Sequence, residues 1–266
     1  MSLVQYQVDA FAERVFEGNP AAVVPLKAWP DDALLQAIAM ENNLAETAYF
    51  VPSGEGYELR WFTPTVEVDL CGHATLASAH VLYTELGCSA EPLRFFTRSG
   101  ELQVRRLGTD RYVMDFPAVP TVPCPVPPRL AQALGREPDE MLVGEGYWLA
   151  VYASETEIRA LQPNFAQLSE LDAHGVIVTA PGKQHDFVSR FFAPKIGVAE
   201  DPVTGSAHCR LATYWARRLD KTTLSARQVS PRGGNVGIEL VGARVQLSGR
   251  AALFMVGELR GVALAQ

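Results

Sequence analysis

The spacing of apolar residues predicts both helices and strands along the chain. Residues 31–44 carry leucines and an isoleucine at helical spacing, whereas residues 46–51 alternate as a strand does. The same alternation predicts four further strands, over residues 101–104, 111–116, 237–240 and 243–247. Two alanine-rich runs that each follow a glycine turn favour helix, residues 72–83 and 205–215. Glu46 therefore opens a strand, and strand ends border the loops where functional groups are commonly presented.

Two segments of the chain resemble each other and predict an internal duplication. Residues 60–64 read Arg-Trp-Phe-Thr-Pro, and residues 190–194 read Arg-Phe-Phe-Ala-Pro. The seventh residue after the proline is chemically reactive in both copies, Cys71 in the first and Asp201 in the second, and a glycine turn and a helix follow. The second copy then needs a three-residue insertion between Asp201 and its helix. We therefore expect Asp201 to occupy in the second half the position of Cys71 in the first.

A proline-rich stretch separates the two halves. Residues 117–128 contain six prolines, which excludes regular helix and central strand and predicts an extended linker. We expect an α+β chain with an N-terminal lobe of residues 1–117 and a C-terminal lobe of residues 118–266. The last strand, about residues 252–266, is a candidate to cross back to the N-terminal lobe.

The composition and charge of the chain argue against nucleic-acid-binding, membrane and secreted proteins. The net charge is -7, and the basic residues are scattered rather than clustered, so no nucleic-acid partner is expected. The longest apolar runs are far shorter than the roughly 20 residues of a membrane span, so no membrane partner is expected. The N-terminus has neither a basic region nor an apolar core of the kind that directs secretion, which predicts a cytoplasmic protein.

Cofactor and metal motifs are missing from the sequence. Neither the dinucleotide pattern GxGxxG nor the phosphate-binding pattern GxxxxGK[ST] occurs, and HExxH is absent. The four cysteines include no CxxC pair and have no zinc-ligand spacing with histidine. We therefore expect a protein that works without a cofactor and without a metal.

The glycine turns before the two alanine-rich helices suggest anion sites. A helix N-terminus exposes backbone N–H groups and positive potential, so Gly72 and Gly205 mark two places where a carboxylate could bind, and Ser206 could cap the second helix. Oriented donors of this kind stabilise the charge that builds when a proton leaves the carbon next to an acid. Sequence alone does not rank the available proton carriers, which are Glu46, Cys71, His73 and Asp201.

Four separated motifs carry a resemblance to a known family. They are Gly-Asn-Pro-Ala-Ala-Val-Val at residues 18–24, Asn-Leu-Ala-Glu-Thr-Ala at 43–48, Cys-Gly-His-Ala-Thr at 71–75 and Asp-Pro-Val-Thr-Gly-Ser-Ala at 201–207. In this order, and with the Arg-Gly-Gly turn at 232–234, the chain resembles the PhzF-like family of phenazine biosynthesis over essentially its whole length. The resemblance implies the diaminopimelate-epimerase fold: two pseudo-symmetric lobes, each a barrel-like, mostly antiparallel sheet around a central helix, with the active site between the lobes.

The resemblance also implies an activity. The chain would be a cofactor-independent isomerase, and a homodimer, that shifts a proton on a small carboxylated metabolite. Glu46 would move the proton, while His73, Asp201 and Ser206 would bind and orient the substrate. Further substrate-binding candidates on the matching motifs are Asn19, Cys71, Gly72, Gly205 and Arg232.

Two alternative functions stay open. An epimerase or racemase could use Cys71 and Asp201 from opposite faces of one carbon, although the epimerases of this fold use two cysteines, so a two-thiol racemase is disfavoured. The phenazine isomerase lacks a thiol where Cys71 stands, which also argues against an identical substrate. The second alternative is a metabolite-binding protein without catalysis.

Overall fold

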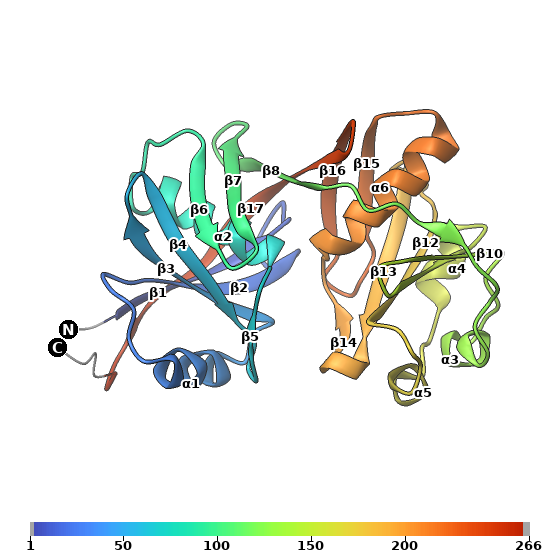
Figure 1. Ribbon diagram of the computed structural model, residues 1–266, viewed down its shortest axis with the longest axis horizontal. Coiled ribbons are helices and arrows are strands. Elements are labelled where there is room, and N and C mark those ends of the chain that lie inside the picture. The colour runs from blue at the N-terminus through green and yellow to red at the C-terminus, as the bar shows by residue number, and fades with distance from the viewer. Residues whose placement is uncertain (1–2, 263–266) are drawn as a thin grey trace. The chain divides into compact units, whose positions relative to one another are not determined.

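The computed structural model describes residues 3–262 as a mixed α/β chain with few helices (Figure 1). Contacts divide the chain into two compact units, one of residues 1–115 with 248–266 and one of residues 116–247. Within the described part, no helix is long and apolar enough to cross a membrane. Of the expected last strand, residues 263–266 lie outside the described residues.

The described residues of the first unit form many strands and two helices. Its elements are β1 (Leu3–Ala10), β2 (Asn19–Pro25), α1 (Asp32–Asn42), β3 (Glu46–Ser53), β4 (Gly56–Phe62), β5 (Glu67–Val68), α2 (Gly72–Thr84), β6 (Leu93–Thr97), β7 (Gly100–Arg106), β8 (Arg111–Pro117) and most of β17 (Arg244–Leu259). The expected helix near residues 31–44 is thus α1, and the expected strand at Glu46 is β3. α1 ends at Asn43, whose left-handed backbone turns the chain toward β3.

The strands of the first unit close into a barrel. β1 pairs with β2, β2 with β3 in parallel, β3 with β4, β4 with β6 in parallel, β6 with β7, and β7 with β8. β8 pairs with β17, and β17 returns antiparallel to β1, with Leu3 opposite Leu259 and Ala10 opposite Ala251. Closure removes the unpaired edges that an open sheet would present.

Helix α2 fills the first unit, as Figure 1 shows. Every residue from His73 to Tyr83 is buried, which is typical of a helix surrounded by strands on all sides. Ala74, Ala77 and Ala79 are fully buried, and small side chains let the backbone approach the sheet closely. Two buried hydroxyls bond within the helix region, since Thr75 donates to the Cys71 carbonyl and Ser78 to the Ala74 carbonyl.

The second unit repeats this order of pairings. Its elements are β9 (Val122–Pro123), α3 (Leu130–Leu134), β10 (Glu140–Gly144), β11 (Tyr147–Val151), α4 (Glu155–Ala160), α5 (Phe165–Ser169), β12 (Gly175–Pro181), β13 (Phe187–Ala193), the 3₁₀ turn η1 (Pro194–Ile196), β14 (Val198–Asp201), α6 (Gly205–Leu219), β15 (Thr223–Gln228), β16 (Gly234–Val241) and the first residues of β17. β10–β11 is antiparallel, β11–β12 parallel, β12–β13 antiparallel, β13–β15 parallel and β15–β16 antiparallel. In the first unit, the pairings from β1 to β7 alternate between antiparallel and parallel in the same order.

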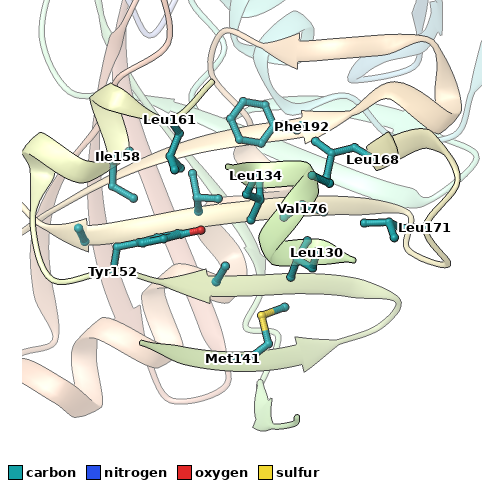
Figure 2. Packing of buried hydrophobic residues seen from close by; sticks show 14 of the residues in the cluster. Leu130, Leu134, Met141, Tyr152, Ile158, Leu161, Leu168, Leu171, Val176 and Phe192 are labelled. Atoms are coloured by element: carbon teal, nitrogen blue, oxygen red, sulfur yellow. The ribbon is translucent and has the colours of Figure 1, made fainter. Parts of the chain in front are cut away.

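The core of the second unit lies between its short helices and its sheet. Figure 2 shows leucines of α3 and α5 packed with Phe192 and Val176 of the central strands. The expected linker of residues 117–128 is not wholly irregular, because β9 within it pairs with β10. α6 corresponds to α2 but keeps a polar face, and Arg217 lies on its exposed side.

Strand register corrects the expected equivalence of Cys71 and Asp201. Trp61 pairs with Val68, seven positions later, whereas Phe191 pairs with Asp201, ten positions later. The three extra residues therefore lie in the turn that contains η1, before Asp201 and not after it. Asp201 corresponds to Val68, and both lie four positions before the first residue of their helix.

Candidate active site

Glu46 is the first residue of β3, at an end of the barrel sheet. Its parallel neighbour on β2 is Ala21, which has no side chain long enough to cover the carboxylate. The Glu46 side chain is 18% exposed, so it is largely shielded from water yet reachable. A carboxylate in that position can meet a small molecule without being fully hydrated.

Cys71 and His73 flank the start of α2. Cys71 is the N-cap residue in extended conformation, and its carbonyl accepts a hydrogen bond from the Thr75 hydroxyl at 2.6 Å. His73 is buried, and its Nδ1 lies 3.5 Å from Cys71 Sγ. On the other side of the ring, Nε2 lies 3.1 Å from Glu46 Oε2. The strand end and the helix start thus bring three proton-carrying groups together.

Asn19 contacts the same ring nitrogen of His73 as Cys71 does. It is the first residue of β2, fully buried, and its Nδ2 lies 3.2 Å from His73 Nδ1. An amide nitrogen can only donate, so Nδ1 of a neutral ring accepts and Nε2 carries the proton toward Glu46. The preceding Gly18 has a φ of +65°, and a Cβ there would lie 2.1 Å from the Ala10 carbonyl oxygen. Only glycine fits this approach to Asn19.

His73 Nε2 and Glu46 Oε2 lie close together but are not aligned as a hydrogen bond. Although Nε2 and Oε2 are 3.1 Å apart, neither buried atom has a partner of good hydrogen-bond geometry among residues 3–262. The carboxylate therefore lies off the axis of the ring N–H. One carboxylate oxygen of Glu46, the sulfur of Cys71 and one ring nitrogen of His73 all lie within 4.8 Å of one another.

Burial and charge set the protonation of this cluster. Burial raises the pKa of the Cys71 thiol to about 11, and the Glu46 carboxylate adds to the rise. The thiol is therefore protonated at neutral pH. Burial opposes a charge on His73, but negative charge on Cys71 and Glu46 favours it, and the pKa of the imidazole is raised. Because the thiol carries no charge at neutral pH, Glu46 is the neighbour that raises the pKa of His73 there.

In the second unit, Asp201 belongs to a separate hydrogen-bonded network. The Thr204 hydroxyl donates a short hydrogen bond to Asp201 Oδ2. Fully buried Gln228 accepts from the Thr204 N–H at 2.9 Å and donates to the Asp201 carbonyl at 2.6 Å. Together these contacts fix the carboxylate just before α6 begins.

The other predicted site residues of the second unit lie at the start of α6 and in the turn before β16. Gly205 begins α6, and Ser206 is its exposed second residue, so the expectation that Ser206 caps this helix is wrong. The N-cap is Thr204, whose hydroxyl is directed to Asp201 instead. Arg232 is partly buried in the turn before β16.

Sequence reasoning missed Thr204 and Gln228. Thr204 stands within the motif of residues 201–207 and could have been found as the residue before the helix glycine. Gln228 lies 24 positions later in β15, and no local pattern marks it. Only the parallel pairing of β13 with β15 shows why it reaches this network.

The acid–base cluster of the first unit has no counterpart in the second. In the repeated register, Cys71 corresponds to Thr204 and His73 to Ser206. Glu46 corresponds to Gly175, since each opens the strand that runs parallel to β2 or β11. A Cβ on Gly175 would lie 2.5 Å from the Phe191 ring, so this ring takes the space that a side chain would need.

The first unit thus defines a class of protein: a closed barrel around a buried helix, with a carboxylate, an imidazole and a thiol gathered at the helix start. The family of phenazine biosynthesis-like proteins, PhzC–PhzF, matches residues 8–257. An uncharacterized isomerase of Pseudomonas aeruginosa is 56% identical over 259 residues, covering 97% of this chain and 99% of that protein. The chain belongs to the phenazine biosynthesis-like family, as its motifs predict.

Solved structures agree with this assignment. The crystal structure of a PhzF family protein from Enterococcus faecalis superimposes with a TM-score of 0.94 at 48% identity, covering 97% of this chain and 99% of the other. A probable proline racemase from Agrobacterium radiobacter has a TM-score of 0.65 at 10% identity, covering 98% and 93%. The latter likeness shows a shared fold with the racemase and epimerase proteins and nothing about the reaction.

Proposed function

We propose that the protein is an isomerase that shifts a proton on a small carboxylated metabolite without a cofactor, with Glu46 as the proton carrier. The single observation that carries the proposal is the pairing of a mostly buried carboxylate with a buried imidazole at 3.1 Å. Membership of a family that includes proteins named as isomerases supports the class of reaction. Asp201 and Ser206 would orient the substrate, as the resemblance implies.

The chemistry needs one carrier. Glu46 removes a proton from an activated carbon and becomes a carboxylic acid, while the electron pair of the broken C–H bond delocalises into the substrate. The same carboxylic acid then returns the proton to a second carbon, so charge and atoms balance. His73 Nε2 lies beside Glu46, and the raised pKa of His73 favours a cation that stabilises the Glu46 carboxylate before it takes the proton and after it returns it.

A two-base epimerase is less well supported. A thiol with a pKa of about 11 is thiolate in only about one molecule in ten thousand at pH 7, so Cys71 is a poor resting base. Its counterpart in the repeat is Thr204, and a hydroxyl is a weaker base still. With one carrier, part of a deuterium label on the substrate should return to the product, whereas two opposed bases would place solvent hydrogen there.

Glu46→Gln tests the proposal against a non-catalytic binding protein. Conjugated cyclic acids and amino acids are first screened by thermal shift, because a ligand at 100 times its Kd stabilises a protein by about 2.7 kcal/mol. Proton exchange on each hit is then followed by NMR in deuterated water. We expect Glu46→Gln to retain binding and lose turnover by about 10²–10⁴-fold. The matched control is Glu41→Gln, on the exposed side of α1. Unchanged turnover in Glu46→Gln refutes the isomerase proposal.

We also propose a cytoplasmic homodimer, and an apolar patch of the first unit supports the dimer. Phe254, Met255 and Val256 are consecutive exposed residues of β17, and the exposed Phe16 ring packs edge-on against Phe254 at 5.5 Å. Exposed apolar side chains close to one another in the sequence favour association. Sedimentation of Val256→Glu should show a shift toward monomer; an unchanged dimer would place the interface elsewhere.

A further inference from the structure

Trp61 of β4 has a buried indole N–H group without a partner. The residue is 1% exposed, and among residues 3–262 its Nε1 atom has no hydrogen-bond acceptor. The next residue, Phe62, packs against the core cluster around α1, so the Trp61 side chain points to the opposite face of the sheet, toward α2. An indole nitrogen can only donate, and a buried donor without an acceptor costs stability. Any arrangement of the site that brings an acceptor to Trp61 is therefore favoured.

The strand register places Trp61 beside Glu46. Trp61 is opposite Ala48 in the antiparallel pair of β3 and β4, and Glu46 lies two positions before Ala48 on the same face of β3. Glu46 and Trp61 are thus diagonal neighbours, which lie about 7–8 Å apart, within reach of an aromatic ring and a long side chain. The carboxylate and the indole N–H group can therefore meet without a change in the backbone.

The repeat indicates which way a ring at this position leans. Phe191 of β13 is the counterpart of Trp61, since it is opposite Ile177, and Gly175 lies two positions before Ile177. The Phe191 ring lies 2.5 Å from the place that a Cβ on Gly175 would take. Because Gly175 is the counterpart of Glu46, the ring in the repeat leans along the same diagonal. The same lean in the first unit predicts that the Trp61 indole lies against the Glu46 side chain.

Glu46 offers the acceptor that Trp61 lacks. Its Oε2 atom is buried, and no donor among residues 3–262 is aligned with it, although His73 Nε2 lies 3.1 Å away. The Glu46 side chain is 18% exposed, so a change between staggered rotamers meets little packing. This rotation would give an acceptor to the indole and an aligned donor to the carboxylate, two buried groups that lack one in the present arrangement.

We propose that Trp61 is a positioning residue for Glu46. Its Nε1–H group donates to the Glu46 carboxylate in a second rotamer of Glu46, in which the carboxylate has moved away from His73. The carboxylate thus has two resting places, one beside the imidazole and one at the indole. On the isomerase function proposed above, on which this role rests, the two places serve the two carbons between which Glu46 carries the proton. The contact itself does not require that function and is observable without a substrate.

NMR spectra of the indole N–H groups in the full chain test this contact. The sequence has four tryptophans, and Trp61→Phe identifies the Trp61 signal. Phenylalanine occupies the equivalent place in the repeat, so this variant should fold. A hydrogen bond to a carboxylate moves an indole N–H signal downfield. We therefore expect Glu46→Ala to move the Trp61 signal upfield.

Trp29 and Glu58 are the matched control pair, because Trp29 Nε1 donates to Glu58 Oε2 at 2.5 Å on the surface of the same unit. Glu58→Ala should move the Trp29 signal and leave the Trp61 signal unchanged. A Trp61 signal that stays in place in Glu46→Ala, or that moves as far in Glu58→Ala, overturns the proposal. If Trp61→Phe does not fold by circular dichroism, Phe substitutions of the other tryptophans identify the Trp61 signal by elimination, and Glu46→Ala decides.

Turnover separates this role from the isomerase function. The substrates are those conjugated cyclic acids and amino acids that exchange protons in deuterated water. We expect Trp61→Phe to lower kcat by about 10-fold or more with little change in KM, because the lost hydrogen bond is one to a charged group. Unchanged kcat in Trp61→Phe overturns the role of Trp61 and leaves the isomerase proposal standing. Unchanged turnover in Glu46→Gln refutes the isomerase, and the NMR signals then still decide whether the indole contacts the carboxylate.

Discussion

Gln228→Ala should be among the most destabilising single changes in the second unit, although Gln228 belongs to none of the sequence motifs. The side chain is fully buried and makes hydrogen bonds to Thr204 and to the Asp201 carbonyl. Alanine removes the acceptor of the buried Thr204 N–H and one donor to Asp201. Each buried polar group that loses its partner costs about 1–3 kcal/mol, and the space left behind adds to this. We expect a total loss of about 3–5 kcal/mol.

Thermal unfolding followed by circular dichroism measures this loss. For a chain of this size, about 1 kcal/mol lowers Tm by roughly 2–4 °C, so Gln228→Ala should lower Tm by roughly 6–20 °C. Gln103→Ala is the control, because Gln103 is exposed and its side chain donates to Glu101 in a surface contact. It should stay within about 0.5 kcal/mol of the wild type. A loss of less than about 1 kcal/mol in Gln228→Ala would refute the view that this network fixes Asp201.

Two further predictions concern the first unit. Gly18→Ala should cost about 1–2 kcal/mol of stability for its left-handed backbone and about 1–3 kcal/mol more for the collision with the Ala10 carbonyl. Gly54 has a similar φ but open space around it, so Gly54→Ala should show only the first of these costs. Urea unfolding measures both variants, and equal losses would contradict this prediction. The raised pKa of His73 contributes stability that is fully present below about pH 6.5 and lost as pH rises through the folded-state pKa. Glu46→Gln should flatten the decline of Tm above that pH, and parallel curves for the two proteins would show that Glu46 does not raise this pKa.

Sequence patterns predicted the elements that position the first cluster. α2 and β3 begin where the glycine turn and the alternation place them, so Glu46, Cys71 and His73 could be named in advance. The approach of β3 to the start of α2 could not be predicted from the sequence, because the parallel pairing of β2 with β3 depends on contacts between residues far apart in the chain.

The second half was harder to predict, for two physical reasons. An insertion in a turn leaves no hydrophobic signature, so the three extra residues near η1 were assigned to the wrong side of Asp201. The short helices α3, α4 and α5 are each six residues or fewer, too short for apolar periodicity to identify them. Their packing against the sheet, rather than local preference, stabilises them.

The return of β17 to β1 has a consequence for how the protein is made. A ribosome releases residues 3–115 long before it has made residues 248–259, yet the early barrel cannot complete its ring without that last strand. Residues 116–247 form one continuous stretch, so the second unit does not depend on a strand that is made later. During synthesis residues 116–247 can therefore fold first, and the sheet of residues 3–115 keeps exposed edges until residues 248–259 have been made.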